Sequence, residues 1–163
     1  MGASRARRHH GFTLIELLIT VTIVGILAKL GAPALHQMML AQDVRSATSD
    51  LQTALYFARS EAIKRATNVD TTPTSSDWKN GWTIRVSGGG AVLRQHAALN
   101  SELSAMVGST ITYRSDGRVT STPGTITVKT SDSGVQWRCI KIDLSGRPNV
   151  NNYAFSGAAN TCS

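Results

Sequence analysis

An unbroken apolar segment near the start of the chain limits what this protein can fold into more than any other feature. Residues 12–35 read FTLIELLITVTIVGILAKLGAPAL, 24 residues with only two ionisable groups, Glu16 and Lys29. A helix needs about 20 mostly apolar residues to cross a bilayer. Three arginines of the first eleven residues precede the segment, and the positive-inside rule keeps such residues cytoplasmic. We therefore predict a single membrane pass, with the rest of the chain outside the cytoplasm.

A secretory signal peptide is the alternative for this segment. Its basic and apolar regions fit, and Ala32-Pro33-Ala34 imitates a small-residue cleavage site. However, a glutamate does not fit the apolar core of a signal peptide, and a proline between the two small residues makes a poor cleavage site. In a bilayer Glu16 costs about 2.5–3.5 kcal/mol, and such residues usually persist because a partner neutralises them. If the segment crosses a membrane, we therefore expect a positively charged partner for Glu16.

The length and the charge favour one mildly basic domain outside the membrane. The chain has 163 residues, about the length of a single domain. Its formal charge is +7, but without Arg5, Arg7 and Arg8 14 basic residues face 10 acidic ones, which leaves +4. This excess tolerates anionic partners without requiring them.

The sequence offers little for catalysis or metal binding. Its four histidines are scattered over the chain and form no metal-ligand spacing with Cys, Asp or Glu: His9, His10, His36 and His96. The glycines at 88–90 predict a flexible hairpin tip, because no Lys-Ser/Thr pair follows them to hold a phosphate. We therefore expect no enzymatic activity, no cofactor and no metal.

Residues 36–67 continue the helix with an amphipathic pattern. Small apolar residues recur three or four positions apart from Leu40 to Ala62, which is helical periodicity. We predict one helix from residue 12 to about residue 67, with its second half packed on a globular head. A coiled coil is the alternative, but an alanine-rich stripe suits packing against a sheet better than a Leu/Ile zipper.

Residues 68–163 predict a β-rich head. Short runs rich in β-formers cover residues 81–87, 91–96, 110–115, 118–120, 125–130 and 135–144. Turn residues at 88–90, 116–117 and 123–124 predict antiparallel hairpins. In the last run, apolar residues occupy both odd and even positions, so they would lie on both faces of a strand. This is expected for a central or bulged strand. The predicted fold class is α+β, a long N-terminal helix packed on an antiparallel sheet.

Two tryptophans, Trp78 and Trp82, flank an Asn-Gly turn just before this sheet. They fit either of two roles, anchoring a hairpin to the helix or forming an exposed recognition patch. We favour anchoring.

The start of the apolar segment resembles a known processing site. Residues 11–16 read GFTLIE after a short basic leader, and this resembles the prepilin-peptidase site of type IV pilins and type II secretion pseudopilins. In that family the peptidase cuts after the glycine, methylates the new N-terminal phenylalanine and leaves a glutamate at the fifth mature position. The resemblance implies cleavage after Gly11, methylation of Phe12 and a filament-assembly role for Glu16, paired with a neighbouring subunit's N-terminal amine. Pro33 falls where family members often have a helix-kinking proline.

The resemblance also implies an organisation, partners and a location. It divides the chain into a leader peptide (1–11), a transmembrane and filament-core helix half (12–35), an amphipathic helix half (36–67) and a β-rich pilin head (68–163). The implied partners are other pilins in a filament, the prepilin peptidase and the bacterial inner membrane. The chain is then expected to cross that membrane once with a periplasmic head, and to reach the pilus or cell surface after assembly.

A second resemblance narrows the branch. Residues 77–82 read DWKNGW, which resembles the entrance to the sheet in H-type pseudopilins and FimT/FimU minor pilins. One implied function is a minor type IV pilin near the filament tip that supports pilus assembly. The other is the H-type minor pseudopilin of a type II protein secretion system. We favour the minor pilin, with the pseudopilin as the alternative, because the sequence separates the two poorly.

The C-terminal part of the chain is basic, with six Lys or Arg against three Asp from residue 111 onward. Its Gly146-Arg147-Pro148-Asn149 run resembles the Gly-Arg-x-Arg motif by which FimT-type minor pilins contact DNA in natural transformation, with Asn149 in place of the second arginine. A solvated surface arginine is the alternative, which stays open. The resemblance implies that double-stranded DNA is a further partner, contacted by Arg147. From the basic surplus of this half we predict that Arg118, Arg138 and Lys141 help to bind it.

The two cysteines, Cys139 and Cys162, lie in the last strong strand run and next to the C-terminus. In an oxidising periplasm we predict that they form a disulfide, which closes a loop of about 20 residues. Two free thiols are the alternative in a reducing compartment.

Overall fold

The computed structural model of the chain describes residues 12–120 and 124–153. A single helix, α1, runs from Leu14 to Arg65 over 52 residues, which confirms the long helix predicted from residue 12 to about residue 67. Pro33 lies inside it. The chain divides into two compact units, Met1–His36 and Gln37–Ser163, and α1 contributes to both. Each unit is described by itself.

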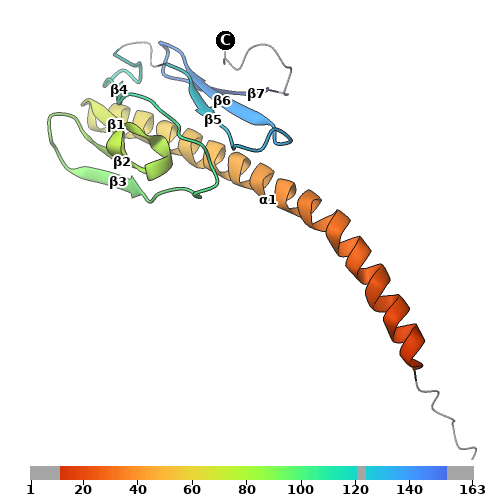
Figure 1. Ribbon diagram of the computed structural model, residues 1–163. Helices are drawn as coiled ribbons and strands as arrows, with labels where there is room; N and C mark the ends of the chain where they lie inside the picture. Colours follow the sequence, from red (N-terminus) through yellow and green to blue (C-terminus); the bar gives the residue numbers. More distant parts are fainter. Residues whose placement is uncertain (1–11, 121–123, 154–163) are drawn as a thin grey trace, which may run out of the picture. The chain divides into compact units, whose positions relative to one another are not determined.

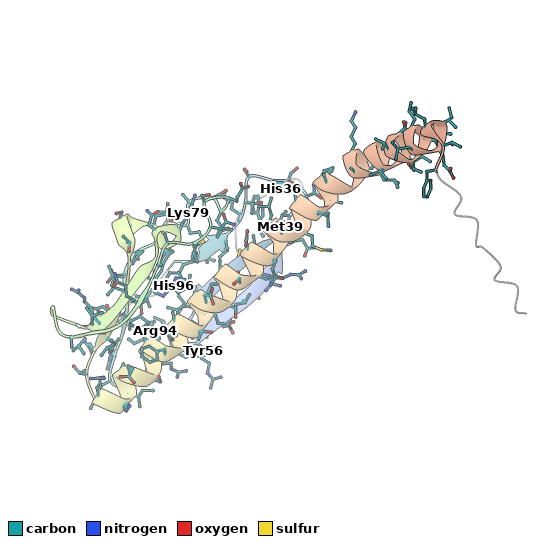
Figure 2. All side chains as sticks on the ribbon, turned by 90° about the horizontal axis from the view of Figure 1, so that it is seen from below. His36, Met39, Tyr56, Lys79, Arg94 and His96 are labelled. Carbon is teal, nitrogen blue, oxygen red and sulfur yellow. The ribbon has the colours of Figure 1, made fainter. Side chains whose placement is uncertain are left out.

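In the first unit the apolar side chains of α1 are uncovered. All residues from 12 to 30 are exposed, and Figure 2 shows their side chains extending on all sides of the helix. By length and composition α1 is apolar enough to cross a membrane, a test that a signal sequence near the N-terminus also passes. An apolar surface of this extent is unfavourable in water, so the segment needs a lipid or protein environment.

In the second unit, the end of α1 packs against two antiparallel sheets (Figure 1). The first has the order β3-β2-β1-β4, and the second has the order β5-β6-β7. Two short 3₁₀ turns, η1 (Thr74–Ser76) and η2 (Trp78–Asn80), separate β1 from β2. The strands are β1 Val69–Pro73, β2 Trp82–Val86, β3 Val92–His96, β4 Ile111–Tyr113, β5 Ile126–Val128, β6 Trp137–Ile142 and β7 Pro148–Tyr153.

The alanine-rich stripe of α1 faces the core of this unit. The predicted stripe from Leu40 to Ala62 is buried, including four alanines, and it packs with strand residues of both sheets. Alanine brings the helix backbone close to the sheets, which explains why the coiled-coil alternative does not apply. Among the described residues, the buried core residues lie between Leu40 and Ile142, so none of them comes from the first unit.

The two tryptophans anchor the head, as favoured from the sequence. Trp78 of η2 (Trp78–Asn80) is 0% exposed and Trp82 of β2 is 1% exposed, with ring centroids 6.4 Å apart. Asp77 fixes the η2 turn, because its Oδ1 accepts hydrogen bonds from the backbone N–H groups of Lys79 (2.9 Å) and Met106 (2.8 Å). The burial of both rings excludes an exposed tryptophan patch.

Most of the predicted strands are confirmed. The β2–β3 hairpin turns at residues 88–90, where Gly88 and Gly89 have φ of +76° and +81°, a conformation that costs glycine little. The central position of β6 between β5 and β7 explains its apolar residues of both parities. The turn at 116–117 is confirmed by the hydrogen bond from Gly117 N to Arg114 O (2.8 Å). Of the predicted 123–124 turn, residue 123 lies outside the described residues.

The strand prediction is wrong at three places. Residues 118–120 form no strand of their own; Val119 forms an isolated bridge to Tyr113, flanked by hydrogen bonds from Arg114 N to Arg118 O (2.7 Å) and from Thr120 N to Thr112 O (3.1 Å). Two strands, β1 and β7, were not predicted. The two strands that were missed are held by antiparallel pairing, β1 with β2 and β7 with β6.

Candidate functional site

The first candidate site is the N-terminal turn of α1. Phe12 precedes the helix and is exposed, while Gly11 lies outside the described residues. The backbone N–H of Glu16 donates a 3.3 Å hydrogen bond to Thr13 Oγ1, so Thr13 caps the helix and Glu16 occupies the third helical position. This is the spacing of a capping box, and a carboxylate in the first turn also complements the helix dipole.

The surroundings of Glu16 define what this turn can do. Large apolar side chains, including Leu14 and Ile15, are exposed on either side of it. No cation of residues 12–120 and 124–153 forms an ion pair with Glu16. In an apolar environment such a carboxylate can form an ion pair with a cationic group of another molecule.

The second candidate site lies where two turns of the head touch. Gly117 follows β4 and Gly146 joins β6 to β7, with φ of +76° and +78°. A Cβ added to Gly146 would clash with the carbonyl oxygen of Gly117, so these turns are in direct contact. The structure therefore brings together two predicted DNA-contacting residues, the exposed Arg118 and Arg147.

Asp143 shapes the turn that presents Arg147. Its carboxylate accepts hydrogen bonds from Ser145 Oγ and from Arg147 N, the latter at 3.3 Å. The Ser145 hydroxyl, then the Arg147 N–H and more weakly the Arg147 charge, hold the pKa of Asp143 below its usual range. An ionised Asp143 thus stabilises the turn, and its charge offsets part of that of Arg147.

The other two predicted DNA-contacting residues do not share a face. Side chains alternate across a strand, and in β6 Arg138 has the parity of Ile140 and Ile142, which lie in the core. Lys141 lies on the opposite, outer face, where it pairs in register with Asn149 of β7. Arg138 and Lys141 therefore cannot form one surface, whereas Lys141 and Asn149 are neighbours.

Sequence reasoning missed one basic residue at the contacting turns. Arg59 of α1 donates a 2.9 Å hydrogen bond from Nε to the carbonyl oxygen of Gly117. Its position on the amphipathic helix gives no hint of this contact, because 58 residues separate the two partners.

His96, the histidine of the head, is held by contacts with an aromatic ring and with α1. The ring of His96 stacks on Trp82 with centroids 4.1 Å apart, and its Nε2 lies 4.0 Å from Asp50 Oδ2 on α1. Arg94 of the same strand lies over the ring of Phe57 at 5.4 Å. Figure 2 shows Arg94 and His96 between β3 and α1. In the described part of the chain no three His, Cys, Asp or Glu side chains group as metal ligands.

Cys139 is 2% exposed at the centre of the β5-β6-β7 sheet, opposite Thr127 of β5 and Asn151 of β7. Cys162 lies outside the described residues. The disulfide between them stays a prediction.

An N-terminal helix with an uncovered apolar first half, whose second half packs on an antiparallel head, defines a subunit of the pilin type. The sequence matches the family model described as Type II transport protein GspH over residues 47–146, more than half of the chain. It also matches the prokaryotic N-terminal methylation motif over residues 6–28. The chain belongs to this GspH family of pilin-like and pseudopilin-like proteins, a family of structural subunits and not of enzymes.

Two solved structures resemble the chain, both crystal forms of the type IV minor pilin FimU from Pseudomonas aeruginosa PAO1. The P21 form has 22% sequence identity and a TM-score of 0.60, over 68% of this chain and 89% of FimU. The P65 form has 23% identity and a TM-score of 0.57, over 66% of this chain and 91% of FimU. At this identity the likeness establishes the pilin fold. A search of curated protein sequences finds no significant match.

Proposed function

We propose that the chain is a minor type IV pilin that joins a filament through α1 and supports pilus assembly. The observation that carries this proposal is that the apolar first half of α1 is uncovered, while no described residue of the head core comes from it. The membrane covers such a helix before assembly, and neighbouring subunits cover it in a filament. Residues 1–11 act as the leader, 12–35 as the membrane and filament-core half, 36–67 as the amphipathic half and 68–163 as the periplasmic head.

The H-type minor pseudopilin of a type II secretion system is the second candidate. The description of the matched family favours it, whereas the resemblance to FimU favours a pilus. Both candidates use the same leader, helix and head. Deleting the gene separates them, because loss of a minor pilin lowers piliation and loss of a pseudopilin lowers protein secretion. Gene neighbourhood gives an independent indication.

Processing provides the direct test of both candidates. The basic leader, Gly11 and Phe12 match the methylation motif, so we expect cleavage between these two residues and one added methyl group on Phe12. Mass spectrometry of protein purified from cells with active prepilin peptidase checks this. A terminus at Met1, or a terminus beyond Pro33 as signal peptidase would give, contradicts the proposal.

We propose further that the head binds double-stranded DNA weakly and without sequence preference, which would serve DNA uptake in natural transformation. The contact between the turns that carry Arg118 and Arg147 supports this proposal. Phosphate contacts release counterions, so the binding constant falls with salt with a log-log slope of about −0.9 per neutralised phosphate.

Two substitutions test the DNA role. Arg147→Ala should weaken binding equally for all sequences and reduce the salt slope by about 1. Asn149→Arg should strengthen binding, because it places a second cation beside Lys141 in the register of β6 and β7. Titration of labelled duplex DNA at several salt concentrations measures both. Absence of binding at low salt, or no gain in Asn149→Arg, would leave a purely structural subunit.

A further inference from the structure

Arg59 links the helix to the two touching turns. Its Nε donates to Gly117 O at 2.9 Å, and the neighbouring turn of α1 also reaches this place, because a Cβ on Gly117 would meet the Ile63 side chain. Three segments far apart in sequence therefore converge: the end of α1, the turn after β4 and the β6–β7 turn. We call this the three-segment surface, defined by Arg59, Arg118 and Arg147.

The charge of this surface is positive after its acids are counted. The cations are Arg59, Arg114, Arg118 and Arg147, and the acids of the same turns are Asp116 and Asp143. Asp116 pairs with Arg114 at 3.2 Å, while Asp143 accepts hydrogen bonds inside the β6–β7 turn. Arg59, by contrast, forms no ion pair with an acid of residues 12–120 and 124–153.

The hydrogen bond to Gly117 also orients Arg59. It uses the Nε–H, and the terminal guanidinium nitrogens have no hydrogen-bond partner among the described residues. Arg59 is half-buried, so less side-chain entropy is lost when it contacts an anion than for a fully mobile arginine. The planar guanidinium suits phosphate oxygens, which accept two parallel hydrogen bonds.

We infer that Arg59 is a third phosphate-binding residue of the DNA surface, held beside Arg118 and Arg147 by its bond to Gly117. This inference rests on the proposed DNA role. It assigns to α1, the filament-forming helix, a direct part in binding the ligand. Bound DNA would then lie across the end of α1 and both turns rather than on the β6–β7 turn alone.

Charge-specific variants of the full chain in non-ionic detergent test the inference. Arg59→Gln keeps an amide N–H that can donate to Gly117 but removes the charge, and Arg59→Lys keeps the charge. We expect Arg59→Gln to reduce the salt slope for random-sequence duplex DNA by about 0.9, and Arg59→Lys to preserve it. The matched control is Arg45→Gln, an exposed arginine of α1 about 21 Å along the helix at 1.5 Å per residue, which should leave the slope unchanged.

The outcomes separate this inference from the DNA role itself. If the unsubstituted chain binds no DNA, the DNA role fails. If it binds and Arg147→Ala weakens binding while Arg59→Gln keeps the full slope, only the role of Arg59 fails. If Arg59→Gln and Arg59→Lys lower the slope equally along with the melting temperature, Arg59 supports the turn without contacting phosphate, and the inference is overturned.

Discussion

Glu16→Ala should leave membrane insertion intact and reduce incorporation into filaments at least tenfold. In the bilayer the lone carboxylate opposes insertion by about 2.5–3.5 kcal/mol, so its removal should not hinder insertion. In a filament, the proposed pair with a neighbour's terminal amine is lost, and that amine is left unpaired in an apolar interior. Breaking a buried ion pair in this way costs about 3–5 kcal/mol. Comparing membrane fractions with sheared filaments by immunoblot measures the two steps separately.

Lys29 provides the matched control, as the other ionisable group of residues 12–35. Lys29→Ala changes one charge in the same helix but lies far from the first turn, so it should incorporate normally. Glu16→Gln keeps the shape and the capping position and should fail to incorporate as Glu16→Ala does. Normal incorporation of either Glu16 variant contradicts the proposed pairing.

The helix and the membrane segment were predictable because their signals are local. Hydropathy over residues 12–35 and the three-to-four spacing from Leu40 to Ala62 each depend only on neighbours along the chain. The burial of Trp78 and Trp82 was favoured for the same reason, since two large rings beside a turn need cover. The structure confirms the helix and the burial of both tryptophans, while the membrane pass stays a prediction.

The missed strands depend on partners that are distant in sequence. The β7 sequence, PNVNNY, contains three asparagines, which are depleted in strands, yet it pairs with β6 along its whole length. The β1 sequence, VDTTP, is polar, but it lies between β2 and β4. There Asp70 Oδ1 accepts hydrogen bonds from Ser87 and Thr112 at 2.7 Å each. Neither arrangement follows from local propensity.

The basic surface was predictable only in part. Arg138 and Lys141 are three positions apart in one strand, so the period of two already places them on opposite faces, a check that the sequence permits. The contact between Gly117 and Gly146 and the bond from Arg59 to Gly117 join segments separated by dozens of residues. Those contacts could not be predicted from the chain alone.

Cys162→Ser should lower the free energy of unfolding of the head by about 3 kcal/mol, as expected for a disulfide that closes a loop of about 20 residues. The proposed bond ties the C-terminal residues to Cys139 at the centre of the β5-β6-β7 sheet. Half of the last ten residues are Gly, Ala or Asn, and Phe155 is their one large apolar side chain, so little apolar surface would hold this segment without the bond. Urea unfolding of fragment 37–163, which contains every described core residue, measures the loss, and non-reducing peptide mapping identifies the bond.

A double-mutant cycle tests the pairing itself. Cys139→Ala should cost about as much as Cys162→Ser if the bond is the main contribution of both residues. The double variant should then lose little more than either single variant, because both changes remove the same interaction. Treating the unsubstituted fragment with a reductant should reproduce the loss, and the double variant should not respond to it. Two free thiols in periplasmic material, or additive losses in the cycle, would show that Cys139 stabilises the sheet by packing alone.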